Sequence, residues 1–135
     1  MTSNDRTRPE VLSTPGADDH NLYLYSAPGR AGVHRRATRP DGTAVLTASG
    51  ELDLDSVGCL RQALTDARND GATRIQLDLT AVTFGDSTFL NTLLTARNKP
   101  GQLVLTGPLP DHLRHLFDLT GATRLFHIAD DDTAA

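Results

Sequence analysis

The sequence has 135 residues, a formal net charge of −4, and 38% hydrophobic but only 4% aromatic residues. This length predicts one domain, with a core built mainly from Leu, Val, Ala and Ile. The acidic balance argues against binding to nucleic acid or to an anionic membrane, because both need a basic patch.

The two ends of the chain read differently from its middle. Residues 1–30 are rich in Thr, Ser, Asp, Pro and Gly, which predicts a flexible N-terminal tail. Within them, "LYLYS" at 22–26 has the composition of a short strand, but nothing in the sequence places it in a fold. The ordered domain is expected to span 31–130, and 131–135 to form a disordered C-terminus.

Strands and helices are expected to alternate along the ordered part. Alternating or β-branched apolar residues predict strands, and apolar residues at spacings of three and four predict helices. The expected strands are 32–38, 43–49, 73–84, 102–107 and 124–129, and the expected helices lie within 53–71, 87–97 and 109–121. The order β-β-α-β-α-β-α-β predicts one α/β domain with a mostly parallel central sheet of about four to five strands and three or more helices.

The stretch "VTFGDSTFLNTLL" at 82–94 places a serine at a strand-to-helix turn. Ser87 is expected in the first helical turn, directly after Asp86. Backbone N–H groups there lack helical partners and the helix dipole is positive, so the fold would tolerate a phosphate. Ser and Asp are also ordinary helix-capping residues, and local chemistry alone leaves both interpretations open.

Three separated motifs carry a family resemblance. "GELD" (50–53), "LDLTAVTFGDST" (77–88) and "LTGATRLFHI" (119–128) resemble, in this order, the STAS domain of anti-sigma factor antagonists. The likeness covers roughly residues 31–130. It implies a STAS-like fold, a role in the regulation of transcription through protein–protein interaction, and no enzymatic activity or cofactor of the chain's own.

The resemblance also implies a phosphorylation switch. In this family the serine directly after the aspartate is phosphorylated by an anti-sigma factor that is itself a serine kinase. The match falls on Ser87, followed by Thr88. The unphosphorylated form binds the anti-sigma factor and releases the sigma factor, and phosphorylation ends that binding.

Two positions depart from the family pattern. Gly85 stands where an apolar residue is usual, and Phe89 replaces a glycine. On the expected helix Leu90, Leu93 and Leu94 already form an inward stripe, so Phe89 is predicted to be exposed as part of the partner surface. That predicted surface comprises Asp53, Asp86, Ser87, Thr88 and Phe89, although Asp53 equally fits a role that is limited to capping the first helix.

Two other functions compete with this interpretation. The first is a STAS-type scaffold that binds partners in a signalling assembly without phosphorylation, and Phe89 favours it. The second, a serine hydrolase, lacks a G-x-S-x-G elbow in "FGDSTF". A receiver domain phosphorylated on Asp78 is also disfavoured, because the only lysine, Lys99, lies in a predicted turn.

No metal, nucleotide or membrane site is predicted. His112 and His115 have a spacing that can share a metal, but solvated helix residues explain them better. A Gly-rich phosphate-binding loop is absent. The single cysteine, Cys59, cannot form an internal disulfide and is expected to be half-exposed and without function. Without an apolar leader or a long apolar run, the expectation is a soluble, cytoplasmic protein.

Overall fold

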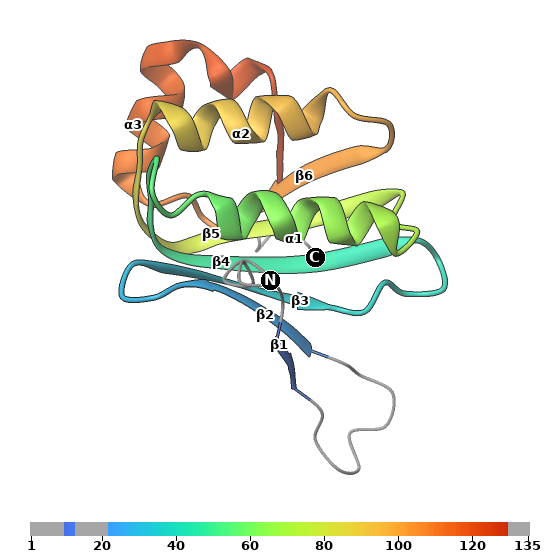
Figure 1. The fold of residues 1–135 in the computed structure, drawn as a ribbon. Helices are drawn as coiled ribbons and strands as arrows, with labels where there is room; N and C mark the ends of the chain where they lie inside the picture. Colours follow the sequence, from blue (N-terminus) through green and yellow to red (C-terminus); the bar gives the residue numbers. More distant parts are fainter. Residues whose placement is uncertain (1–9, 13–21, 130–135) are drawn as a thin grey trace.

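A computed structural model describes residues 10–12 and 22–129 and arranges them around one sheet (Figure 1). Its seven described strands lie side by side in chain order. They are β1 (Glu10–Leu12), β2 (Leu22–Ala27), β3 (Ala31–Arg36), β4 (Thr43–Leu52), β5 (Arg74–Gly85), β6 (Gln102–Thr106) and β7 (His127–Ala129). Neighbouring strands are antiparallel from β1 to β4 and parallel from β4 to β7.

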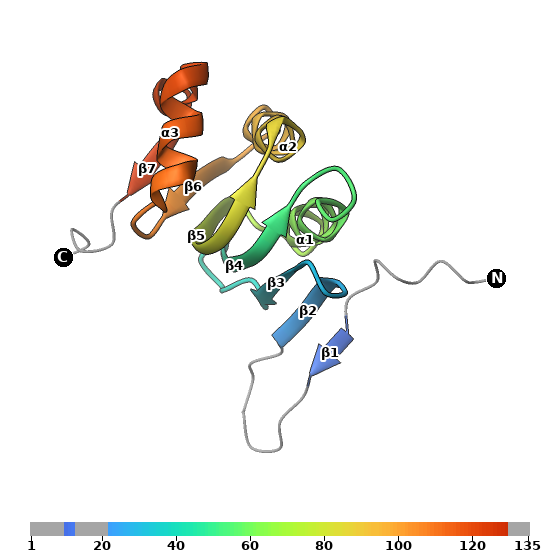
Figure 2. The same ribbon diagram turned by 90° about the vertical axis from the view of Figure 1, so that its left-hand side faces the viewer.

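Each of the three helices connects two neighbouring parallel strands. They are α1 (Gly58–Asn69), α2 (Ser87–Arg97) and α3 (Asp111–Thr120), and a short 3-10 helix η2 (Ala122–Arg124) precedes β7. Figures 1 and 2 show α1 and α2 side by side over one face of the sheet. Strand residues that point to this face alternate with polar ones and are buried, among them Ala44, Leu46, Ala48, Ile75, Leu77 and Leu79.

The α/β fold class is confirmed, but the sheet is wider than predicted. The expected boundary at residue 30 is wrong, because β2 pairs with β3 from Leu22↔Arg36 to Ala27↔Ala31. The sequence indicated a possible short strand at "LYLYS", but the polar residues on either side of it led to its inclusion in the predicted tail. What the sequence predicts for 1–9, 13–21 and 131–135 lies outside the described residues.

Tyr25 shows why β2 belongs to the domain. Its side chain is fully buried, and its hydroxyl donates to Asp66 of α1 at 2.9 Å. Arg35 of β3 donates from Nε to the same hydroxyl at 3.0 Å and stacks over the Tyr23 ring, 4.1 Å from its centroid. Burial raises the pKa of Tyr25 to about 12. The first strands and α1 are thus joined by a polar network inside the domain.

Cys59 is buried rather than half-exposed, with 3% of its surface accessible. The sequence prediction assumed a narrow apolar stripe on α1. Instead, α1 packs on β2 and β3 as well as on β4, so its buried face widens to include Cys59 and Ala63. Burial raises the pKa of the Cys59 thiol, which disfavours the reactive thiolate.

Candidate functional site

The start of α2 presents an exposed serine, and a carboxylate caps the helix behind it. β5 ends at Gly85, and Asp86 then adopts an extended backbone as the N-cap of α2. Its Oδ1 accepts from the backbone N–H groups of Thr88 at 2.9 Å and Phe89 at 3.0 Å. Ser87 is exposed, whereas Thr88 is half-buried. Of the two hydroxyl residues, Ser87 is the more accessible from solvent.

The capping bonds change the chemistry expected of a phosphate here. The backbone N–H groups of Thr88 and Phe89 are already occupied by Asp86. A phosphate on Ser87 would therefore meet the positive end of the helix dipole, but would also lie close to a capping carboxylate. A phosphate at this position would therefore be neutralised only in part by the chain itself.

The prediction that Phe89 is exposed is wrong, since its side chain is completely buried. Its ring lies against the backbone of Gly85: a Cβ built there would be 2.5 Å from Phe89 Cδ2. The same Cβ would be 3.1 Å from Leu113 Cδ2 of α3. Gly85 is thus required for space, and Phe89 fills the volume that a side chain at position 85 would take.

The "GELD" turn lies beside this helix start, at the edge of the sheet that is formed by the carboxyl ends of the parallel strands. The parallel register pairs Leu52 with Gly85, so the residues that follow them, Asp53 and Asp86, leave neighbouring strand ends. Gly50 has φ +87°, and a Cβ on it would be 2.2 Å from the Arg30 carbonyl oxygen. This glycine lets the β2–β3 turn approach closely enough for Arg30 to reach Asp53.

Asp53 stabilises its own turn. Its carboxylate forms an ion pair with Arg30, and its Oδ1 accepts from the N–H groups of Asp55 at 3.0 Å and Ser56 at 3.2 Å. Burial opposes its ionisation, yet hydrogen bonds from Arg30 and Ser56 hold the pKa of Asp53 below its usual value. The N-cap of α1 is Val57, without a side-chain cap. Asp53 thus caps the turn that precedes α1.

Two exposed apolar side chains at this edge were missed by the sequence analysis. Phe84, near the end of β5, is 46% exposed, and Leu54, directly after Asp53, is 74% exposed. An irregular β4–β5 register near Gly50 interrupts the simple in-and-out alternation, which is why the pattern did not reveal Phe84. A groove of about 460 Å³ also runs along α2, lined by Ser87, Thr88, Leu90, Asn91 and Leu94.

The competing sites find little support in the described part of the chain. His112 and His115 are both exposed on α3, and no group of three metal-ligating side chains occurs there. Among the described hydrogen bonds, none joins a histidine to Ser87. Within these residues, no helix has the length and apolar character needed to cross a membrane.

Comparisons with known proteins place these features in a family. Residues 36–127 match the family described as "Mlab, STAS domain". An anti-sigma-B factor antagonist of Staphylococcus aureus is 33% identical over 95 residues, which are 67% of this chain and 87% of that protein. The anti-sigma-F factor antagonist RsfB of Mycobacterium tuberculosis is 33% identical over 96 residues, covering 67% and 79%.

A solved structure agrees with this match. The crystal structure of an anti-sigma factor antagonist from Mycobacterium paratuberculosis superposes with a TM-score of 0.61 at 29% identity. The match covers 77% of this chain and 89% of that one.

Proposed function

Because the chain belongs to the STAS domain family of anti-sigma factor antagonists, we propose that it binds an anti-sigma factor and that phosphorylation of Ser87 ends this binding. The observation that carries the proposal is the exposed hydroxyl of Ser87 at the capped start of α2, beside the "GELD" turn. The anti-sigma factor is then also the serine kinase. The chain itself performs no catalysis.

The physical basis of the switch is the charge that a phosphate adds to an interface. It adds about −1.5 to −2 charges next to Asp86. Asp86 already occupies the nearest N–H groups of the helix, so an approaching partner must itself neutralise the phosphate. Burying an unpaired anion costs several kcal/mol, and about 1.4 kcal/mol is tenfold in affinity. One phosphate would therefore weaken binding by about a hundredfold or more.

The proposed partner surface combines Ser87 and Thr88 with Asp53, Asp86 and Phe84. Phe84 takes the role of aromatic anchor that the sequence assigned to Phe89. It is 46% exposed and its backbone register places it opposite Glu51, at the strand end from which the "GELD" turn leaves. Exposed aromatic side chains that a partner covers are frequent hot spots.

Phosphate transfer and site mapping test the switch. The chain is incubated with ATP and a purified candidate anti-sigma kinase, and intact mass and fragmentation spectra are recorded. The expected result is one phosphate on Ser87, which persists in Thr88→Ala and is absent in Ser87→Ala. The unphosphorylated chain and Ser87→Ala should bind the kinase, whereas the phosphorylated chain should not. Phosphate on Thr88 would contradict the assignment.

The same experiment separates the alternative scaffold function. A STAS scaffold would bind the partner without accepting phosphate. The sequence argument for it relied on an exposed Phe89, and that residue is buried. No observation on the described residues now favours the scaffold or the hydrolase over the switch.

A further inference from the structure

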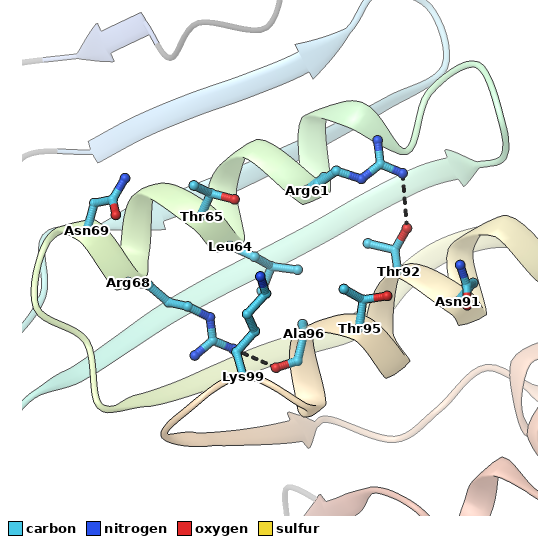
Figure 3. Close-up of a pocket in the computed structure, with 10 residues that line it drawn as sticks. All are labelled: Arg61, Leu64, Thr65, Arg68, Asn69, Asn91, Thr92, Thr95, Ala96 and Lys99. Atoms are coloured by element: carbon cyan, nitrogen blue, oxygen red, sulfur yellow. Dashed lines mark hydrogen bonds between the residues drawn. The ribbon is translucent and has the colours of Figure 1, made fainter.

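A second surface, between α1 and α2, collects positive charge. Figure 3 shows this groove of about 420 Å³, with Arg61 and Arg68 on α1 and Lys99 just after α2. Its other lining residues are uncharged, most of them Thr and Asn. Within the part of the chain that the structure describes, no carboxylate lines the groove. The whole chain carries a net charge of −4, so the positive charge of this groove is opposite in sign to that of the protein as a whole.

Arg68 contributes a partly buried charge. Its guanidinium donates to the carbonyl oxygens of Ala96 at 2.7 Å and Pro100 at 2.6 Å, which ties α1 to the end of α2. The two carbonyl oxygens carry only partial negative charges, as at the negative end of a helix dipole, so they offset the guanidinium charge of Arg68 only in part. Burial lowers the pKa of Arg68, which reflects the incomplete solvation of its charge.

Arg61 lies at the other end of the groove. Its side chain is exposed and its nearest bond is a long one, 3.4 Å to the Thr92 hydroxyl. Arg61 and Arg68 are seven residues apart on one helix, so their Cα atoms are separated by about 10 Å along its axis. Their guanidinium groups contact Thr92 and Ala96, which lie one turn apart on α2, so the two charges face different parts of the groove. The charge pattern fits an elongated ligand with at least two anionic groups.

We propose that this α1–α2 groove binds an acidic peptide segment of a partner protein. In an extended segment every second side chain points to the same face, so alternate carboxylates can reach successive cations of the groove. Thr65 and Thr95 line the groove between Arg61 and Arg68 and offer hydroxyl groups to such a backbone. Binding here needs neither Ser87 nor its phosphate, so this proposal stands apart from the switch.

A labelled acidic peptide tests the proposal. The affinity of fluorescein-labelled hexaglutamate is measured by fluorescence anisotropy at about 20 mM salt, where charge attraction is weakly screened. The double variant Arg61→Gln/Lys99→Gln should weaken binding at least about fivefold. Arg114→Gln/Arg124→Gln removes the same charge from exposed positions outside the groove and should weaken it less than about twofold. Labelled hexaglutamine should not bind.

Amide shifts of the ¹⁵N-labelled chain supply the location. Hexaglutamate should move the signals of 61–69 and 91–99 before those of the Ser87 turn. If both double variants weaken peptide binding equally, the binding depends on the net charge of the chain and not on the groove, and the proposal is wrong. Absence of binding at low salt would also overturn it. So would ATP or inorganic phosphate displacing the peptide more effectively than unlabelled hexaglutamate, because the groove would then be a small-phosphate site.

Discussion

Gly85 and Phe89 share one volume at the start of α2. The glycine is not held in a left-handed conformation, since its φ is outside the positive range, and its role is to leave space. The Phe89 ring and the Leu113 side chain of α3 both reach into that space. The absence of a side chain at Gly85 thus makes room for the ring of Phe89.

This packing predicts opposite outcomes for two phenylalanines. Phe89→Ala should lower the free energy of unfolding by about 3–5 kcal/mol because it empties a buried site. Phe84→Ala, at a half-exposed position, should cost less than about 1 kcal/mol. Urea unfolding followed by circular dichroism measures both. Similar losses in the two variants would mean that the ring of Phe89 is not enclosed.

A double-mutant cycle tests the shared volume directly. Gly85→Leu alone should destabilise the fold by about 1–3 kcal/mol through overpacking. In the Phe89→Ala background the same leucine should cost less, or restore stability, with a coupling of at least about 1 kcal/mol. Additive effects in the cycle would show that the two positions do not compete for space.

Tyr25 predicts a loss of stability at alkaline pH. Burial raises its pKa to about 12 in the folded chain, compared with about 10 when unfolded. The folded state holds the hydroxyl proton of Tyr25 more tightly than the unfolded state does. The contribution of this group to the free energy of unfolding is therefore complete below pH 10 and is lost as the pH rises through 12. Urea unfolding between about pH 9 and 12 should show this decline. In Tyr25→Phe the free energy of unfolding should fall less steeply with pH. An equally steep fall in the variant would mean that other groups cause the decline.

At the scale of elements, α2 depends on one carboxylate for its first turn. Asp86→Ala removes the acceptor for the N–H groups of Thr88 and Phe89 and should cost about 1 kcal/mol. Asp86→Asn keeps a capping oxygen and should remain within a few tenths of a kcal/mol of the native chain. Unfolding measurements rank the three proteins. If Asn is as damaging as Ala, the negative charge itself is what stabilises the helix.

The helices and parallel strands could be predicted because their signals are local. Apolar spacing and the ends marked by Asp86 and Gly121 depend on the sequence nearby, and α2 begins where the pattern placed it. The burial of Phe89 could not be predicted from its helix alone, because the ring fills the space left free by Gly85 at the end of β5. A helix viewed alone shows one apolar stripe, whereas a helix packed between a sheet and another helix buries a wider face.

At the scale of the whole molecule, the N-terminal boundary was the main error. "LYLYS" has the composition of a strand, but the bond of Tyr25 to Asp66 joins residues that are 41 positions apart, which no local pattern reveals. The role of Asp53, Asp86 and Ser87 as a partner surface stays a prediction. Asp53 and Asp86 follow neighbouring parallel strand ends, which the order of strands and helices predicts, whereas the exposure of Phe84 depends on a local irregularity in the register.

Removing β2 should therefore damage the whole domain. A chain that begins at Ala31 loses the buried Tyr25 ring, its bond to Asp66 and the strand that covers the edge of β3. Losing a buried aromatic costs about 3–5 kcal/mol, so its melting temperature should fall by about 10 °C or more.

A matched chain that begins at Leu22 keeps β2 and should melt much closer to the full-length protein. Thermal unfolding followed by circular dichroism compares the three. The Ala31 chain should also self-associate, because β3 then presents an unpaired edge, and light scattering measures this. If the Ala31 and Leu22 chains melt together, β2 contributes no stability. The domain would then begin at β3, as the composition of the first 30 residues suggested.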